Sequence, residues 1–389
     1  MQLFLFTTMK IFITADWHFG VQSNGKIENG INSRIHDISI VIDSFIKDVR
    51  KNKPDIVIIA GDLFHTNKPS PYLINLVTSK IVELAKYSKV VIIPGNHDQS
   101  HNTSAVQFLG TASLPNVYAS ELPIIHHIDD CTIACFPYPR KSVYGTDDNY
   151  MLNVAEDIYR LEDTSDAIGA SYRFLVTHLT CQGFSYGIER GMAILTESNI
   201  DYETLTNYEW DAVFMGHIHQ QQYKEIDGIP IMYVGSPMVM DFGEEGQSKG
   251  YYVWEDNEIY FIELKHRKYQ TVRIKVSDDE NAQQYVENIV RNTVFNSTAI
   301  VRIIIETSQQ ISIQPLFKLL KHLYHVSGIQ VKRPDRKLIE DEEGEKIDIT
   351  TFTPSDLMEL WLYNNGVEDD DELDTLLDLF EELSHGKES

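Results

Sequence analysis

The sequence predicts an α/β core, followed by a small α+β domain and C-terminal helices. Between residues 9 and 265, short apolar strand-like runs alternate with stretches of helical periodicity. Residues 266–335 show a similar alternation on a smaller scale, in a β-α-β-α-β order. Beyond a charged segment, apolar residues again recur at helical spacing. The predicted organisation is a core domain at 1–265, a small capping domain at 266–335, an acidic linker at 336–352 and C-terminal helices at 353–389.

Five apolar runs in the core segment predict strands that are covered on both faces. Each run is three or four residues long and most are rich in β-branched side chains, which is typical of buried strands. The runs are 11–13, 56–59, 90–93, 174–176 and 212–215. Between them, 35–51 and 71–87 have helical character, and Ile38, Ile42 and Val49 lie on one apolar stripe of the first.

The second half of the chain is predicted from the same periodicities. Strands are expected at 271–276, 299–305 and 328–332, with helices at 280–292 and 314–325. Residues 336–349 are charged and poor in large apolar groups, which predicts a linker. A helix is expected to begin at Thr353, and a last helix at about 370–384. Its apolar face consists of Leu373, Leu376, Leu377, Phe380 and Leu383.

The charge balance limits the functional classes that the chain can belong to. The 33 basic and 58 acidic residues give a net charge of -25, which argues against a protein that coats DNA nonspecifically. Bound divalent cations would add positive charge that this count omits, so a DNA substrate stays possible. No apolar run is long enough to span a membrane, and the apolar start lacks the basic flank of a signal peptide.

The three cysteines predict a reducing compartment. Cys131, Cys135 and Cys181 cannot all pair within the chain, and no second Cys or His pair near the first two completes a zinc site. We therefore expect reduced thiols packed in the core of a cytoplasmic protein.

Each of the five predicted core strands ends in polar residues that can bind metal. The segments are Asp16-Trp17-His18, Gly61-Asp62-Leu63-Phe64-His65, Gly95-Asn96-His97-Asp98, Thr177-His178 and Gly216-His217-Ile218-His219. Ligands of open α/β sheets gather at the carboxyl ends of the strands, so these five ends are expected to converge on one site.

The donor types at these ends indicate hard or borderline divalent cations. Residues i and i+2 of an extended segment point to the same side, so Asp16 and His18, or His217 and His219, can face one metal. Carboxylate, imidazole and amide oxygen suit Mn²⁺, Mg²⁺, Fe²⁺ or Zn²⁺, and no cysteine joins the set. A single histidine after a strand is usually a packed or solvated residue, but five such ends in order favour a shared two-metal site.

This ordered series is similar to that of the calcineurin-like metallophosphoesterases. Within that superfamily, it resembles the SbcD-type nucleases of DNA double-strand-break repair in bacteria and phages. The resemblance is carried by ADWHFG, AGDLFH, IPGNHD, VTHLT, MGHIHQ and VGSPM, and it is strongest over 10–265. It implies a metallophosphoesterase-type core of two packed β-sheets flanked by helices, and a DNA-binding role for the capping domain.

The resemblance also implies a role for each motif residue. One metal would be held by Asp16, His18, Asp62 and His219. The other would be held by Asp62, Asn96, His178 and His217, with Asp62 bridging the two. His97 matches the catalytic histidine, Asp98 would orient it, and His65 matches a histidine that helps to place DNA.

The implied activity is 3′–5′ exonuclease cleavage of duplex ends and endonuclease cleavage of single strands and hairpins. The implied cofactors are two divalent metal ions, Mn²⁺ or alternatively Mg²⁺. Two alternatives stay open from the residues: a small-molecule or protein phosphoesterase of the same superfamily, and a non-catalytic scaffold. The complete set of metal-binding residue types disfavours the scaffold.

The family resemblance also implies partners. Helices after a linker would bind an SbcC-like coiled-coil ATPase, and the nuclease would form a homodimer within a heterotetramer. The alternative for the last helices is docking onto the chain's own small domain; the linker favours a partner. We expect no membrane association, and a cytoplasmic location in a bacterial cell or a phage-infected host.

Overall fold

A computed structural model gives the architecture of the chain. The described residues are 9–100, 103–145, 150–185, 200–206, 209–277 and 281–332, with short pieces at 339–340, 346–347, 358, 362, 375–377 and 380. In these ranges no helix combines the length and the hydropathy that a membrane span requires.

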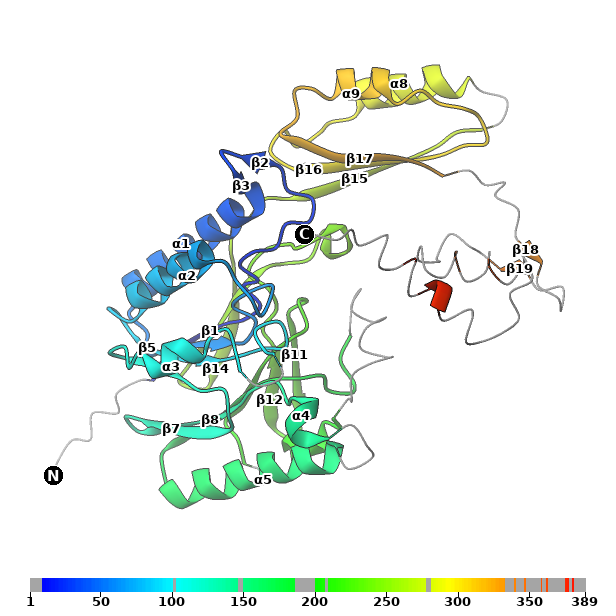
Figure 1. Ribbon diagram of the computed structural model, residues 1–389. Helices are drawn as coiled ribbons and strands as arrows, with labels where there is room; N and C mark the ends of the chain where they lie inside the picture. The colour runs from blue at the N-terminus through cyan, green and yellow to red at the C-terminus, as the bar shows by residue number, and fades with distance from the viewer. Residues whose placement is uncertain are drawn as a thin grey trace.

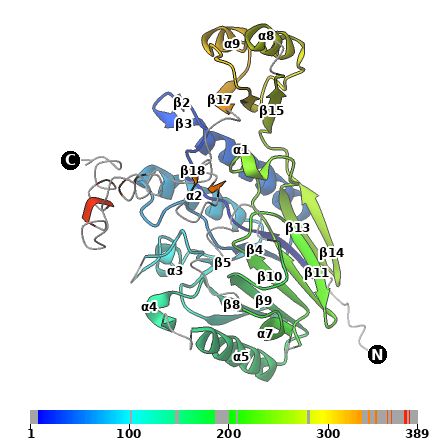
Figure 2. The ribbon, with the colours of Figure 1, turned by 90° about the vertical axis from the view of Figure 1, so that its right-hand side faces the viewer.

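Two six-stranded sheets form the core, as the resemblance implied (Figures 1 and 2). The first has the order β14-β13-β1-β4-β5-β6. Its strands are β1 (Lys10–Thr14), β4 (Ile56–Ala60), β5 (Lys89–Ile93), β6 (Val117–Ala119), β13 (Gly250–Glu255) and β14 (Glu258–Glu263). The second has the order β11-β12-β10-β9-β8-β7. Its strands are β7 (Ile124–Ile128), β8 (Cys131–Phe136), β9 (Tyr172–His178), β10 (Ala212–Gly216), β11 (Gln222–Ile226) and β12 (Ile229–Tyr233).

Apolar side chains from both sheets fill the space between them. Ile13 and Ile58 from the first sheet and Cys135, Phe174 and Phe214 from the second belong to one buried cluster. The central strands face this inner cluster on one side and the packed helices on the other. They therefore need apolar residues at consecutive positions, which explains the unbroken apolar runs in the sequence. All three cysteines are free and buried, as expected.

Helices cover the outer faces of the two sheets (Figure 1). Helices α1 (Ser33–Asn52) and α2 (Pro71–Leu84) pack on the first sheet, and α5 (Tyr150–Ile168) packs on the second. The shorter elements are β2 (Ile27–Glu28), β3 (Ile31–Asn32), α3 (Gln107–Thr111), α4 (Lys141–Tyr144), α7 (Glu203–Thr206) and the 3-10 helix η2 (Phe242–Glu244). The predicted α/β fold class is therefore confirmed.

A separate parallel sheet of three strands follows the core, with the predicted β-α-β-α-β order. Its elements are β15 (Tyr269–Lys275), α8 (Ala282–Asn292), β16 (Ile300–Glu306), α9 (Gln314–Leu319) and β17 (His325–Lys332). Helices α8 and α9 lie together on one face of this sheet (Figure 1). Helix α9 is shorter than predicted, because β17 begins at His325 and the Tyr324 backbone amide already bonds to Ser297 O at 2.9 Å.

The small sheet is attached to the core by charged and aromatic contacts. Arg267 pairs with Asp37 of α1 at 2.9 Å. Its guanidinium carbon also lies 3.7 Å from the ring centroid of Tyr324, and Lys26 Nζ lies 3.9 Å from the same centroid. These contacts fix the start of the small sheet against the first turns of the core.

Little of the predicted linker and C-terminal helices lies within the described residues. Inside the predicted linker, β18 (Ile339–Glu340) pairs antiparallel with β19 (Lys346–Ile347), a contact that the charged composition did not predict. Residues 358, 362, 375–377 and 380 are helical, and Leu376, Leu377 and Phe380 are partly buried. Thr353, Leu373 and Leu383 lie outside the described residues. The domain boundaries stay a prediction.

Candidate metal centre

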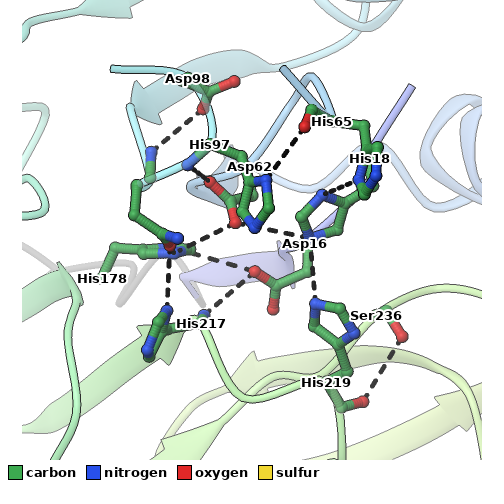
Figure 3. A network of polar contacts seen from close by, with 12 residues as sticks. Asp16, His18, Asp62, His65, His97, Asp98, His178, His217, His219 and Ser236 are labelled. Atoms are coloured by element: carbon green, nitrogen blue, oxygen red, sulfur yellow. Dashed lines mark hydrogen bonds and ion pairs between the residues drawn. The ribbon is translucent and has the colours of Figure 1, made fainter. Parts of the chain in front are cut away.

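The predicted site residues come together where the parallel strands of both sheets end. Strands β1, β4 and β5 run parallel in the first sheet, and β9 and β10 run parallel in the second. The segments that follow them meet in one network of polar contacts (Figure 3). All ten predicted site residues are described: Asp16, His18, Asp62, His65, Asn96, His97, Asp98, His178, His217 and His219.

One group of donors lies at the ends of β1 and β10. Single ligand atoms of Asp16, His18 and His219 all lie within 4.8 Å of one another. The Nε2 atoms of His18 and His219 are 3.0 Å apart. These three are among the four residues that the resemblance assigned to one metal.

A second group lies at the ends of β4, β5 and β9. Asp16, Asp62 and His178 form another set of donors within 4.8 Å. Asn96 Oδ1 lies 3.1 Å from His178 Nε2 and 3.0 Å from His217 Nδ1. The four residues assigned to the other metal are thus neighbours, with Asp16 close to both groups.

Asp62 lies between the two groups. Its Oδ2 atom is 3.4 Å from His18 Nε2 and 3.5 Å from His178 Nε2. Its Oδ1 atom accepts a hydrogen bond from the His97 backbone amide at 2.9 Å, which fixes the carboxylate. This is the position that a bridging carboxylate requires.

The backbone at the site adopts unfavourable conformations that the surrounding strands impose. Asp16, His18, Asp62 and His217 have φ values of 52°, 47°, 50° and 92°, in the left-handed region that non-glycine residues rarely occupy. Such strain concentrates at functional sites, because it aims side chains that regular strands would point elsewhere. Gly61 has φ 96°, and a Cβ atom there would lie 2.1 Å from His178 Nδ1, so this position excludes a side chain.

Burial and mutual interactions set the protonation of the cluster. Burial lowers the pKa of His18 well below its ordinary value. Burial raises the pKa of Asp16, although His178 and His219 oppose it. Burial alone would raise the pKa of Asp62, but His178 and His18 outweigh it and the pKa is lowered. Burial alone would lower the pKa of His178, but Asp62 outweighs it and raises the pKa to about 9. A bound cation would replace the protons that such a cluster otherwise shares.

The donor set fits divalent cations. The buried Asp16 Oδ2 atom has no hydrogen-bond partner among the described residues, which is rare for a carboxylate oxygen and leaves it free to bind a metal. His178 donates Nδ1–H to Ala60 O at 2.8 Å, so its Nε2 lone pair is directed into the site. The metal-competent groups found among the described residues contain oxygen and imidazole nitrogen donors and no cysteine.

The family of the chain is decided by its sequence match. Residues 9–221 match the calcineurin-like phosphoesterase family. The chain belongs to this family. Members hydrolyse phosphoesters with metal ions, and the converged carboxylates, imidazoles and amide oxygen of this phosphoesterase are the residues able to hold them.

Solved structures similar to this phosphoesterase include three from different sources. A protein of Thermus thermophilus is 10% identical, with 67% of this chain and 100% of that chain covered and a TM-score of 0.44. A dimetal phosphatase from Danio rerio is 10% identical, with 66% and 99% covered and a TM-score of 0.43. An archaeal phosphodiesterase is 15% identical, with 66% and 100% covered and a TM-score of 0.36.

His97 lies beside the cluster and its ring is held by the backbone. Its Nδ1–H donates to His65 O at 3.0 Å, and the two imidazole rings are stacked with centroids 5.3 Å apart. The centroid of the His97 ring is 4.8 Å from that of His18. The Nε2 atom of His97 is therefore available to a substrate at the edge of the phosphoesterase centre.

Asp98 is hydrogen-bonded to the backbone of the loops that follow β4 and β5. Asp98 accepts from the backbone amides of Leu63, Phe64 and Gly95 at 3.1, 2.8 and 3.0 Å, whereas the His97 ring bonds to His65 O. Burial and Asp62 raise the pKa of Asp98 to about 7, against the lowering effect of these amides. Asp98 thus joins the loops that follow β4 and β5, and its role in orienting His97 stays a prediction.

A buried ion pair behind His219 was missed by sequence reasoning. Glu244 Oε1 accepts from His219 Nδ1 at 2.7 Å, and Lys249 pairs with Glu244 Oε2 at 2.7 Å. Burial opposes ionisation, but the hydrogen bond from His219 and the charge of Lys249 lower the pKa of Glu244 to about 2. Nothing in the run Gly243-Glu244-Glu245-Gly246 distinguishes this buried acid from a solvated one.

Proposed function

We propose that this phosphoesterase is a two-metal-dependent DNA nuclease, the nuclease subunit of an SbcCD-like complex. The observation that supports DNA as the substrate is a basic face on the three-stranded sheet next to the metal centre. The proposed reaction is phosphodiester hydrolysis, by 3′–5′ exonuclease action on duplex ends and by endonuclease action on single strands and hairpins. Manganese is the proposed metal, with magnesium as the alternative.

The basic face is the side of the small sheet opposite α8 and α9. Val272 and Ile274 of β15 pack toward the helices, so alternate residues point to the other side. That side carries four cations and, among its described residues, one acid. The cations are Arg273, Lys275, Arg302 and Lys332, and the acid is Glu306. In a chain of net charge -25, this concentration favours a polyanionic ligand.

The basic face begins next to the metal centre. The guanidinium carbon of Arg302 lies 4.2 Å from the ring centroid of Phe242, and Phe242 precedes by two residues the Glu244 that holds His219. A DNA strand bound along this face would therefore lie near the cluster.

A cavity of about 330 Å³ opens on the other side of the centre, beside Asn96. Its lining includes Tyr138, Arg140 and Lys141 and no carboxylate among the described residues. This volume is at the lower end of the range of small-molecule sites, and it suits a nucleotide next to the scissile phosphate. The basic side chains would contact the backbone of that nucleotide.

The proposed reaction depends on the metal-binding residues and on His97. Two divalent cations would lower the pKa of a water molecule and stabilise the charge of the phosphoryl transition state. Asp16, His18, Asp62 and His219 would hold one cation. Asp62, Asn96, His178 and His217 would hold the other. His97, oriented by the His65 carbonyl, would give a proton to the leaving oxygen through Nε2, and His65 would help to place the DNA.

The proposed partners rest on the resemblance of the motifs to those of SbcD-type nucleases. The acidic chain would depend on an SbcC-like coiled-coil ATPase for much of its DNA surface, and the C-terminal helices would bind that partner. Leu376, Leu377 and Phe380 are the described residues of the proposed contact, and a homodimer within a heterotetramer is the proposed assembly. Co-purification with a coiled-coil ATPase, lost when residues 353–389 are deleted, would support this assignment.

The activity is tested by giving the purified protein and Mn²⁺ three substrates: labelled duplex DNA, a cyclic nucleotide and an aryl phosphate. Selective digestion of DNA, abolished by His97→Ala in a protein of unchanged circular dichroism, is the expected result. Turnover of the small esters with inert DNA would make the chain a small-molecule phosphoesterase. If no substrate is turned over, the chain would be a non-catalytic scaffold.

A further inference from the structure

The η2 segment, residues 240–245, touches the metal cluster at one end and the three-stranded sheet at the other. On the cluster side, the buried Glu244 carboxylate holds the ring of His219 through a 2.7 Å hydrogen bond from Nδ1. Its second oxygen accepts from the Met240 backbone amide at 3.0 Å. The carboxylate therefore joins a site histidine to the start of its own turn.

Lys249 fixes the other side of this arrangement. Its ammonium group, on a fully buried side chain, donates to His219 O at 2.8 Å and to Ser236 Oγ at 2.9 Å. It also pairs with Glu244 at 2.7 Å. One buried ion pair thus holds His219 at both its ring and its backbone. Removing either charge would leave the other buried and unpaired.

The hydrogen bond to Glu244 determines which nitrogen of His219 is available. Because Nδ1 carries the donated proton, Nε2 keeps its lone pair, and this atom lies 3.0 Å from His18 Nε2. A carboxylate in this position fixes both the tautomer and the ring orientation of a metal-binding histidine.

The sheet side of the segment is equally well held. The Phe242 ring packs edge to face against Tyr269 of β15, with centroids 4.7 Å apart, and Arg302 of β16 stacks on its face. The Tyr269 hydroxyl donates to Met240 O at 3.1 Å. The Thr271 backbone amide donates to Glu245 Oε1 at 2.8 Å. Four contacts from the small sheet therefore fix a turn of six residues.

We propose that Glu244 is a positioning residue for His219, and that the η2 segment transmits the position of the three-stranded sheet to the metal centre. The proposal rests on the proposed function, in which His219 binds metal and the sheet binds DNA. Arg302, on the basic face, and Glu244, on the site histidine, are connected through a single turn. DNA that displaces or orders the sheet would then change the metal site.

Metal affinity tests the positioning role separately from catalysis. Glu244→Gln keeps an acceptor for His219 but removes the charge, and we expect the Mn²⁺ affinity of one site to fall by about 10- to 100-fold. Tyr269→Phe removes only the hydroxyl that holds Met240 O, and we expect a smaller loss of several-fold at the same site. Tyr260→Phe is the matched control, since its hydroxyl bonds to the exposed Glu255 at 3.0 Å, away from the segment. Bound Mn²⁺ would be counted by electron paramagnetic resonance, with folding checked by circular dichroism.

The outcomes separate this inference from the proposed function. A wild-type protein that binds no Mn²⁺ refutes the proposed function and the inference together. A folded Glu244→Gln protein with wild-type affinity at both sites refutes only the positioning role. If Glu244→Gln weakens one site and Tyr269→Phe matches Tyr260→Phe, the link to the sheet is refuted. If Glu244→Gln does not fold, the Mn²⁺ affinity of Tyr269→Phe, compared with that of Tyr260→Phe, decides the inference alone.

Discussion

The Nε2 atoms of His18 and His219 lie 3.0 Å apart, although 201 positions separate the two residues in the sequence. Each comes from a different sheet, one after β1 and the other after β10. Two imidazole nitrogens at this distance, with Asp62 Oδ2 3.4 Å from one of them, form a site whose donors converge on a small volume. That convergence is the basis of the predictions below.

Asp98→Asn should destabilise the fold and disturb His97 indirectly. The carboxylate accepts three backbone hydrogen bonds through two oxygens, and an amide has only one oxygen to offer. A buried amide left unpaired costs about 1–3 kcal/mol, which urea unfolding would measure. Asp163→Asn, on the exposed side of α5, is the control and should change stability little. Equal stabilities for the two variants would show that the three contacts contribute nothing.

His65→Ala should separate cleavage of DNA from hydrolysis of small diesters. The His65 backbone oxygen, which holds the His97 ring, is retained in the variant, while the stacked imidazole is lost. We expect the kcat for bis-(p-nitrophenyl) phosphate to stay within about threefold, and exonuclease cleavage of duplex ends to fall by at least about tenfold. His322→Ala, an exposed residue after α9, should match the wild type in both assays. Parallel losses on both substrates would assign His65 to the metal centre and not to DNA placement.

Arg140→Ala and Lys141→Ala should weaken DNA binding at the cavity beside Asn96. Each removes one cation from the lining, so the KM for DNA should rise several-fold while kcat for a small diester stays unchanged. The slope of log affinity against log salt should fall by about 0.7 for each lost contact with a single strand. Lys51→Ala, at the end of α1, is the matched loss of an exposed cation. An unchanged salt slope in both cavity variants would rule out the cavity as a DNA contact.

His266 should make the fold more sensitive to acid. Burial lowers the pKa of His266 from 6.5 to about 4, although its contact with Leu264 O opposes the shift. Between these two pKa values, His266 is protonated in the unfolded chain but not in the folded chain. The contribution of neutral His266 to the free energy of unfolding is therefore fully present above about pH 6.5 and is lost as the pH falls toward 4. The urea midpoint should drop more between pH 7.5 and pH 5 in the wild type than in His266→Gln. Equal drops would contradict a depressed pKa.

The core of the fold and the site could be predicted because their signals are local. Strands β4 and β10 are apolar at every position, since each contacts buried layers on both faces, and polar residues follow directly where the strands end. Asp62 and His217 therefore stood out in the sequence. The structure adds their left-handed backbone, which no pattern of residue types encodes.

The contacts that sequence reasoning missed depend on long-range packing. Glu244 lies in a turn without periodicity, and its burial depends on His219 and Lys249, which approach it only in the folded chain. The resemblance implied a role for Asp98 beside His97, but not the hydrogen bonds from the Leu63 and Phe64 amides to its carboxylate. Helix α9 ends at Leu319, earlier than its periodicity predicts, because the contact of Tyr324 with Ser297 competes with the helix.

Anomalous diffraction from crystals soaked in Mn²⁺ tests the two-metal centre most directly. Two peaks should flank the Asp62 carboxylate, one beside His18 and His219 and the other beside Asn96 and His178. The absence of peaks at this carboxylate, in crystals that contain Mn²⁺ in the surrounding solution, would contradict the assignment.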